Sequence, residues 1–170
     1  MKKSIIIILI GFLSIIIEGM FGYLLGSFNS IAPNLTLIIV VYLGFYEANP
    51  LGALLAFILG LEVDLTSGIL IGPWAGVFTL VFGILSGLSQ RIFIDSPLSA
   101  SVAIFVSSMI GNLLYLLTTH LSGTAYSRPI LHIMLEAIST AIVAPILFKF
   151  LSKKLFKRIK NRSFRNSRGV

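Results

Sequence analysis

The sequence contains no cysteine and few charged residues. Without cysteine, the chain of 170 residues has no disulfide, no thiolate metal site and no Cys nucleophile. Only two histidines are present, His120 and His132, too few for a histidine-based metal centre. Charged residues make up 11% of the chain, whereas a soluble domain usually carries about 25%. Hydrophobic residues make up 56% and the mean hydropathy is +1.01, so we expect a chain embedded in lipid.

The basic residues lie almost entirely at the two ends of the chain. Lys2 and Lys3 open it, and nine of its thirteen Lys and Arg residues fall between Lys149 and Arg168. The other four basic residues stand against six acidic residues, so the net charge of +7 belongs to a tail. Charge confined to a tail disfavours a nucleic-acid-binding surface, and we expect no nucleic acid partner.

Six hydrophobic segments are separated by short polar joints. They are Ser4–Leu25, Leu35–Tyr46, Leu51–Leu65, Pro73–Ser89, Leu98–Leu121 and Ile130–Leu151. Crossing about 30 Å of hydrocarbon takes roughly 20 helical residues, which the first, fifth and sixth segments provide and the fourth nearly provides. The second and third are either two short helices or a pair that reaches only part-way across. The predicted fold class is all-α: a polytopic membrane protein with about six transmembrane helices in one bundle.

The distribution of charge predicts the orientation of these segments. Six spans place both termini in the cytoplasm and only Arg128 outside, whereas five would place the basic tail outside, against the positive-inside rule. We therefore assign residues 1–151 to a transmembrane bundle and 152–170 to a basic cytoplasmic tail. From Leu147 to Ile159 an apolar residue recurs every four positions, which predicts an amphipathic extension along anionic lipids. A docking site for a cytoplasmic partner is an equally open role for the tail.

Four stripes of small or polar residues occur at helical spacing within the apolar segments. They are Gly11, Ser14, Glu18 and Gly22; Gly52, Ala56, Gly60, Asp64 and Gly68; Gly72, Gly76, Thr79, Gly83 and Gly87; and Ser101, Ser108, Asn112, Tyr115 and Thr119. In lipid, small residues let neighbouring helices approach closely and polar side chains bridge them. Packing within the bundle is the favoured interpretation of each stripe, and a ligand path along one of them is the alternative.

Acidic residues also lie within or at the edge of apolar segments. They are Glu18, Glu62, Asp64 and Glu136. An ionised carboxylate at the bilayer centre costs about 2.5–3.5 kcal/mol, and almost no basic residue is nearby to pair with it. Glu136 follows His132 by four residues and precedes Thr140 by four, so the three share a helix face. We favour a local hydrogen-bonded cluster over a proton relay, because a relay needs a longer chain of such groups.

Glu62 and Asp64 are not predicted to act as a pair. Two residues apart, they point to nearly opposite sides of a helix, so they do not form a catalytic dyad. Asp64 continues the small-residue face that includes Gly60, and a polar turn follows it to Gly72. We expect Asp64 to cap the next helix, with a partner contact through the same turn as the alternative. The chain carries no recognised enzyme motif, so we predict no catalytic activity and no cofactor.

Several short motifs occur in a distinctive order. Pro33-Asn34-Leu35 opens the second segment, and Gly52, Gly60-Leu61-Glu62-Val63-Asp64-Leu65, Ser67-Gly68 and Gly72 follow. Over nearly the whole chain, this pattern and the basic end resemble the family of MreD, a rod shape-determining membrane protein of bacteria. The resemblance implies a non-enzymatic, multi-pass subunit of the cell-wall elongation complex in the bacterial cell membrane.

The resemblance also implies partners and site residues. Partners would be a single-span MreC-type protein, a SEDS-type glycosyltransferase, a class B penicillin-binding protein and the actin-like MreB. A partner helix would lie on a small-residue face, at a depth fixed by the polar turns at Pro33–Asn34 and Asp64–Gly72. We expect the architecture to depend on Pro33, Asn34, Gly60 and Asp64, and Gly60→Leu to disturb partner association.

The alternative is a substrate-binding S-component of an energy-coupling-factor vitamin transporter. That family has a similar size and number of spans and is expected to have a related fold. Its members carry an Ala-x-x-x-Ala face on the first helix, whereas Ser4–Leu25 contains no alanine. A vitamin pocket would also need converging Trp, Arg and Asn side chains, and the chain has one tryptophan, Trp74.

Overall fold

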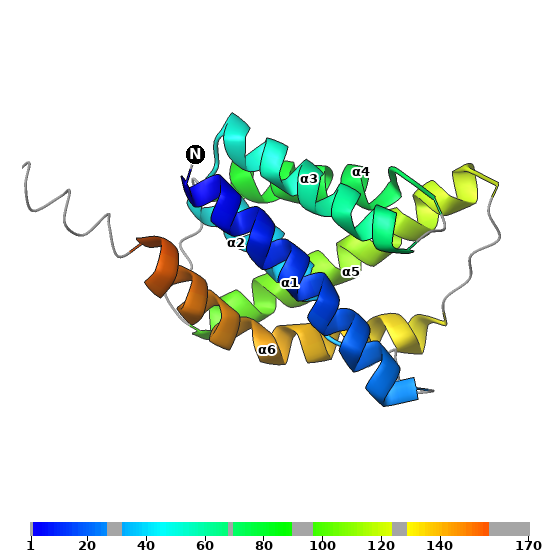
Figure 1. The fold of residues 1–170 in the computed structure, drawn as a ribbon. Helices are drawn as coiled ribbons and strands as arrows, with labels where there is room; N and C mark the ends of the chain where they lie inside the picture. Colours follow the sequence, from blue (N-terminus) through cyan, green and yellow to red (C-terminus); the bar gives the residue numbers. More distant parts are fainter. Residues whose placement is uncertain (1, 27–31, 68–69, 90–96, 124–128, 157–170) are drawn as a thin grey trace, which may run out of the picture.

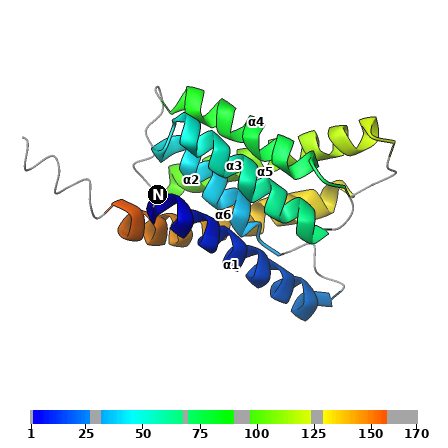
Figure 2. The same ribbon diagram turned by 45° about the horizontal axis from the view of Figure 1, so that its top comes forward.

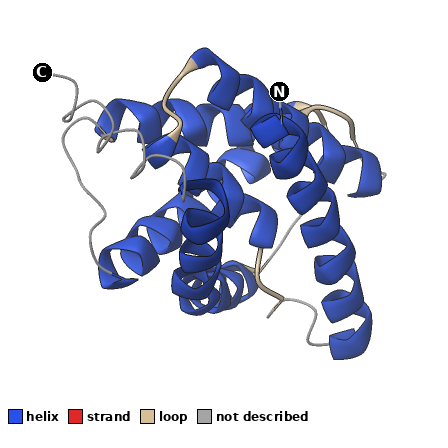
Figure 3. Ribbon diagram, turned by 60° about the vertical axis from the view of Figure 1, so that its left-hand side comes forward, coloured by secondary structure: helices blue, strands red, loops and turns tan. Residues whose placement is uncertain are grey.

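The described part of the chain is entirely helical. The structure is a computed structural model that describes residues 2–26, 32–67, 70–89, 97–123 and 129–156. Its helices are α1 (Lys2–Leu25), α2 (Leu35–Tyr46), α3 (Pro50–Ser67), α4 (Pro73–Leu88), α5 (Pro97–Leu121) and α6 (Ile130–Phe156). No strand occurs in these ranges (Figure 3), so the predicted all-α fold with six helices is confirmed.

Helix α2 forms the centre of the bundle. Every residue from Leu35 to Gly44 is buried, and α2 contacts each of the other five helices. Its sequence is apolar on all sides, as expected for a helix enclosed by other helices. Figures 1 and 2 show the arrangement around it: α3 and α4 lie side by side, α5 and α6 form a second layer, and α1 crosses the bundle obliquely.

Four helices are long and apolar enough to cross a membrane. They contain the candidate spans Ser4–Leu24, Pro50–Ser67, Leu98–Leu121 and Ile130–Leu151. The third segment is therefore longer than the sequence predicted, because the helix begins at Pro50, where a missing backbone N–H is no disadvantage, and continues to Ser67. Helix α2, with 12 residues, is only about 18 Å long, and α4 has 16 residues. About six spans were expected, and by length and composition four of the six helices qualify, while α2 and α4 are shorter than the roughly 20 residues that a span takes.

The outer surface of the bundle is apolar. On α1, Leu9, Phe12, Met20 and Leu24 are among many exposed hydrophobic side chains. In a bilayer these side chains face lipid, so their exposure is expected. The beginning of α1 and the end of α6 lie at the same end of the bundle (Figure 1).

The basic tail falls largely outside the described residues. Helix α6 continues past the predicted end of the bundle at Leu151 and reaches Phe156. Residues 157–170, which make up most of the predicted basic tail, are not described. The binding of this tail to anionic lipids therefore stays a prediction.

Candidate functional site

Asp64 of α3 caps the first turn of α4. One carboxylate oxygen, Oδ2, accepts hydrogen bonds from the backbone N–H groups of Gly72 (2.9 Å) and Ala75 (3.0 Å). The other, Oδ1, accepts one from the N–H of Trp74 at 3.0 Å. Asp64 is only 1% exposed, and the N–H groups at a helix start have no partner within the helix. The positive end of the α4 helix dipole thus stabilises the Asp64 carboxylate, which lipid could not do.

The small residues preceding Asp64 bring α3 and α4 together. A Cβ atom on Gly60 would lie 2.6 Å from both the Ala75 nitrogen and the Trp74 carbonyl oxygen, so only glycine fits there. At Gly52 a Cβ atom would meet the carbonyl oxygen of Glu47 and the ring of Phe82. Gly60 therefore packs within the bundle, as the favoured interpretation of its stripe expected, and a reduced partner association in Gly60→Leu stays a prediction.

Glu18 of α1 caps α2 in the same manner. Its Oε1 atom accepts hydrogen bonds from the backbone N–H of Thr36 at 2.8 Å and from the Thr36 hydroxyl at 3.1 Å. Asn34 supplies a second cap, because its Oδ1 atom accepts from the Leu37 N–H at 2.8 Å. The N-terminus of α2 is thus satisfied without water, as the interior of a membrane protein requires.

Helices α5 and α6 extend this polar network. The backbone N–H of Asn34 donates to the Thr140 hydroxyl at 3.0 Å, and that hydroxyl donates to the Glu136 carbonyl oxygen at 2.6 Å. Asn112 donates to the Glu136 carboxylate at 3.4 Å. Thr140 thus contacts the backbone of Glu136, and the Glu136 carboxylate turns to Asn112 of α5. The half-buried His132 joins none of these bonds.

The two capped helix ends meet at a small polar pocket. Its volume is about 170 Å³, and its lining residues are Glu18, Ala32, Pro33, Asn34, Val63, Trp74 and Glu136. The Trp74 ring stacks on Tyr115 with centroids 4.5 Å apart, which fixes one wall. The polar residues of this lining, Glu18, Asn34 and Glu136, each form hydrogen bonds with a helix end or with a neighbouring helix. Within the described ranges, no group of three or more His, Asp or Glu residues could hold a metal ion.

The turn before α4 contains the last predicted site residues. Gly72 is the N-cap of α4 and has a φ angle of 121°, a conformation that glycine adopts readily. Gly68 lies outside the described residues. The sequence indicated the cap formed by Asp64, but it gave no sign that Glu18 would reach Thr36 or that Asn34 would meet Thr140.

Glu62 differs from the other acids of the bundle. Its Oε2 atom is buried and has no hydrogen-bond partner in the described part of the chain. It lies on the side of α3 that faces α1, where a Cβ atom on Gly11 would come within 3.0 Å of it. The remainder of the Glu62 side chain is partly exposed.

The glycine stripe of α4 faces away from the rest of the chain. Gly76, Gly83 and Gly87 are exposed, and a Cβ atom on any of them would have no neighbour within 4 Å. The prediction that this stripe packs within the bundle is therefore wrong. The buried face of α4 is formed instead by larger residues such as Val77 and Phe78.

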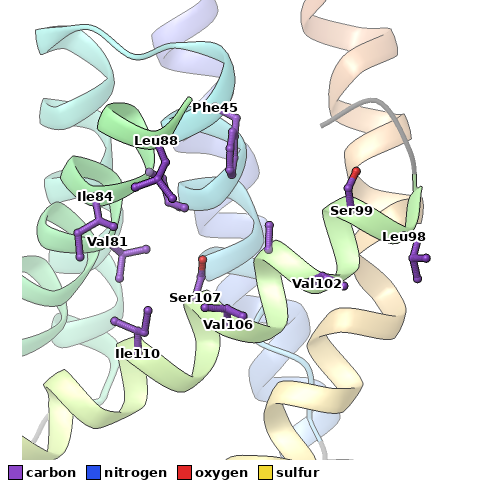
Figure 4. A pocket seen from close by; sticks show the side chains of 12 residues that line it. Phe45, Val81, Ile84, Leu88, Leu98, Ser99, Val102, Val106, Ser107 and Ile110 are labelled. Atoms are coloured by element: carbon purple, nitrogen blue, oxygen red, sulfur yellow. The ribbon is translucent and has the colours of Figure 1, made fainter. Parts of the chain in front are cut away.

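An apolar groove lies between α4 and α5, near the end of the bundle where α4 ends and α5 begins. Its volume is about 500 Å³. Figure 4 shows side chains of α4, such as Ile84 and Leu88, on one side and those of α5, such as Val106 and Ile110, on the other. Phe45 at the end of α2 closes the groove from behind. Ile84 and Leu88 follow Gly83 and Gly87 in the sequence, so they lie about 100° further round α4, and the groove is on a flank of the helix next to the exposed stripe.

Comparison with protein families gives one finding. A family model described as rod shape-determining protein MreD matches residues 2–154. Neither the comparison with curated proteins nor that with solved structures gave a match. The matched range includes helices α1 to α5, all but the last two residues of α6, both capped helix ends and the exposed glycine stripe.

Proposed function

The chain belongs to the family of the rod shape-determining protein MreD, and on that premise we propose that it is a non-enzymatic binding subunit of the cell-wall elongation complex. As a member it is a shape-determining, multi-pass protein of the bacterial inner membrane and part of the MreBCD rod-shape system. In our proposal it holds other subunits by their transmembrane helices. The first partner is a single-span MreC-type protein, followed by a SEDS-type glycosyltransferase, a class B penicillin-binding protein and MreB.

The exposed glycine stripe of α4 is the observation that carries this proposal. Gly83 and Gly87 are four residues apart, face away from the bundle and have open space around them. In lipid, burial of apolar surface does not drive helix association, and close backbone contact at small residues does. A stripe of this kind favours the approach of a helix from outside the chain.

The neighbouring groove gives such a helix a place for its larger side chains. The α4–α5 groove is lined almost wholly by apolar residues and lies on the flank of α4 next to the stripe. A helix that crosses α4 at Gly83 could place leucine or phenylalanine side chains between Ile84 and Ile110. The stripe would then set how closely the helix approaches, and the groove would set its register.

Filling the stripe tests the proposal. We expect Gly83→Leu to reduce co-purification with the MreC-type partner, because the new side chain keeps the partner backbone away. The protein itself should fold, since a Cβ atom at this exposed position meets no other helix of the described chain within 4 Å. The measurement is the amount of partner recovered per tagged subunit from bacterial membranes in which both are expressed.

Gly19→Leu is the matched control. Gly19 is also an exposed glycine within a membrane-spanning helix, and a Cβ atom there has no neighbour within 4 Å. We expect this variant to retain the partner. Equal recovery with Gly83→Leu and wild type would contradict the proposed function of the α4 face.

A further inference from the structure

Glu62 is placed where an apolar side chain would be expected. It lies five residues before the end of α3 at Ser67, about 7 Å below that end at 1.5 Å per residue. Its Oε2 atom rests against Gly11, near the middle of α1, and does not reach toward the end of the bundle. Helices α1 and α3 lie side by side (Figure 2), and many of their apolar side chains are exposed.

The chain itself does not use this carboxyl group. The other carboxyl groups of the bundle, those of Asp64, Glu18 and Glu136, all accept hydrogen bonds within the chain. The Oε2 atom of Glu62 has no such partner among the described residues. An acidic side chain within a membrane-spanning helix is rare and normally pairs with a donor or faces a polar cavity.

Acyl chains cannot supply the missing interaction, because they carry no hydrogen-bond donor. A donor side chain on another transmembrane helix can supply it at the depth of Glu62. The surface around Glu62 suits such a helix, since Leu65, one turn further along α3, is exposed and apolar. An acceptor on an apolar face is complementary to a helix that is apolar except for one donor.

We propose that the α1–α3 face around Glu62 is a second partner-binding surface. Its occupant is a transmembrane helix of another subunit of the elongation complex, and that helix carries a basic, amide, hydroxyl or indole donor at the depth of Glu62. The donor approaches Glu62 from the partly exposed side of this residue, and binding turns the carboxyl group outward from its place against Gly11 of α1. This inference rests on the proposed function, but it concerns a different face from the α4 stripe.

Site-specific photo-crosslinking tests the assignment. The crosslinking amino acid p-benzoyl-phenylalanine replaces Leu65 in the full chain, which is expressed with its partner subunits in bacterial membranes. We expect an adduct with a peptide from a partner's membrane-spanning segment that contains a donor side chain. In E62L the adduct should fall roughly threefold to fifteenfold, the effect of one interhelical hydrogen bond in a membrane.

A conservative variant and a second crosslinking position complete the design. E62Q keeps an acceptor oxygen, so a yield close to that of wild type supports the inference; loss in both variants also supports it and indicates a basic donor. An E62L yield equal to wild type, or adducts with lipid alone, would overturn it. The same crosslinker at Leu80, on the exposed side of α4, reports on the proposed function. If Leu80 gives a partner adduct and Leu65 does not, only the α1–α3 inference fails.

Discussion

The two sides of α3 show how differently one helix can use acidic residues. On the side facing α4, Asp64 is buried and accepts three backbone hydrogen bonds from the turn that begins the next helix. On the side facing α1, Glu62 has a buried oxygen atom without a partner in the described chain. The first side follows from the needs of the fold. The second has no function inside the chain, so it is the side to examine for function outside it.

Capping by acidic side chains also allows the bundle to contain two short helices. A helix that ends inside a membrane protein leaves N–H groups without water, and those groups need acceptors from the protein. Glu18 supplies the acceptor for α2, and Asp64 supplies it for α4. Both capped helices are short, since α2 has 12 residues and α4 has 16. Acidic residues that cap short helices are therefore structural.

The largest effect is expected at Gly60, on the α4 side of α3. In Gly60→Leu the added side chain would collide with the backbone of Ala75 and Trp74, which cannot move without separating the two helices. Overpacking of a core costs about 1–3 kcal/mol and more when backbone must shift, so we expect this variant to be severely unstable. Yield in membranes and thermal stability in detergent are the measurements.

Gly76→Leu is the control for Gly60. Gly76 lies on α4 in the same helix pair, but it is exposed and has no neighbour within 4 Å. A leucine there should leave stability unchanged or raise it slightly, because leucine favours a helix by up to about 1 kcal/mol relative to glycine. Similar instability in both variants would mean that α3 and α4 do not pack as described.

The second largest effect is expected at Asp64. Asp64→Ala removes the acceptor of three backbone N–H groups, of which that of Ala75 is buried, and leaving a buried donor unsatisfied costs about 1–3 kcal/mol. Asp64→Asn retains one acceptor oxygen and should lose less. Unfolding of the purified protein by denaturant in bicelles would rank wild type, Asn and Ala in that order. A stable Ala variant would show that the turn before α4 is held by other contacts.

Much of this contrast could be predicted from the sequence, but not all of it. The spacing from Gly52 to Asp64 indicated one continuous face, and the polar turn after it indicated a cap. The central position of α2 was not predictable, because a lipid-facing helix and a buried helix are equally apolar. The α4 stripe had the spacing of a packing face, yet spacing does not say whether the partner helix belongs to the same chain. Contacts between distant segments, such as Glu18 with Thr36, leave no mark in the sequence pattern.

The smallest effect on stability, and the sharpest test of the comparison, is expected at Glu62. If the carboxyl group has no partner in the chain, Glu62→Leu removes a desolvated polar group and fills its place with apolar atoms. Such a replacement is nearly neutral or stabilising, so the isolated subunit should unfold at the same denaturant concentration or a higher one. Glu18→Leu is the matched control and should lose about 1–3 kcal/mol, because it leaves the Thr36 N–H and hydroxyl without their acceptor. Equal destabilisation by the two substitutions would place Glu62 among the structural acids, and the distinction between the two sides of α3 would then be lost.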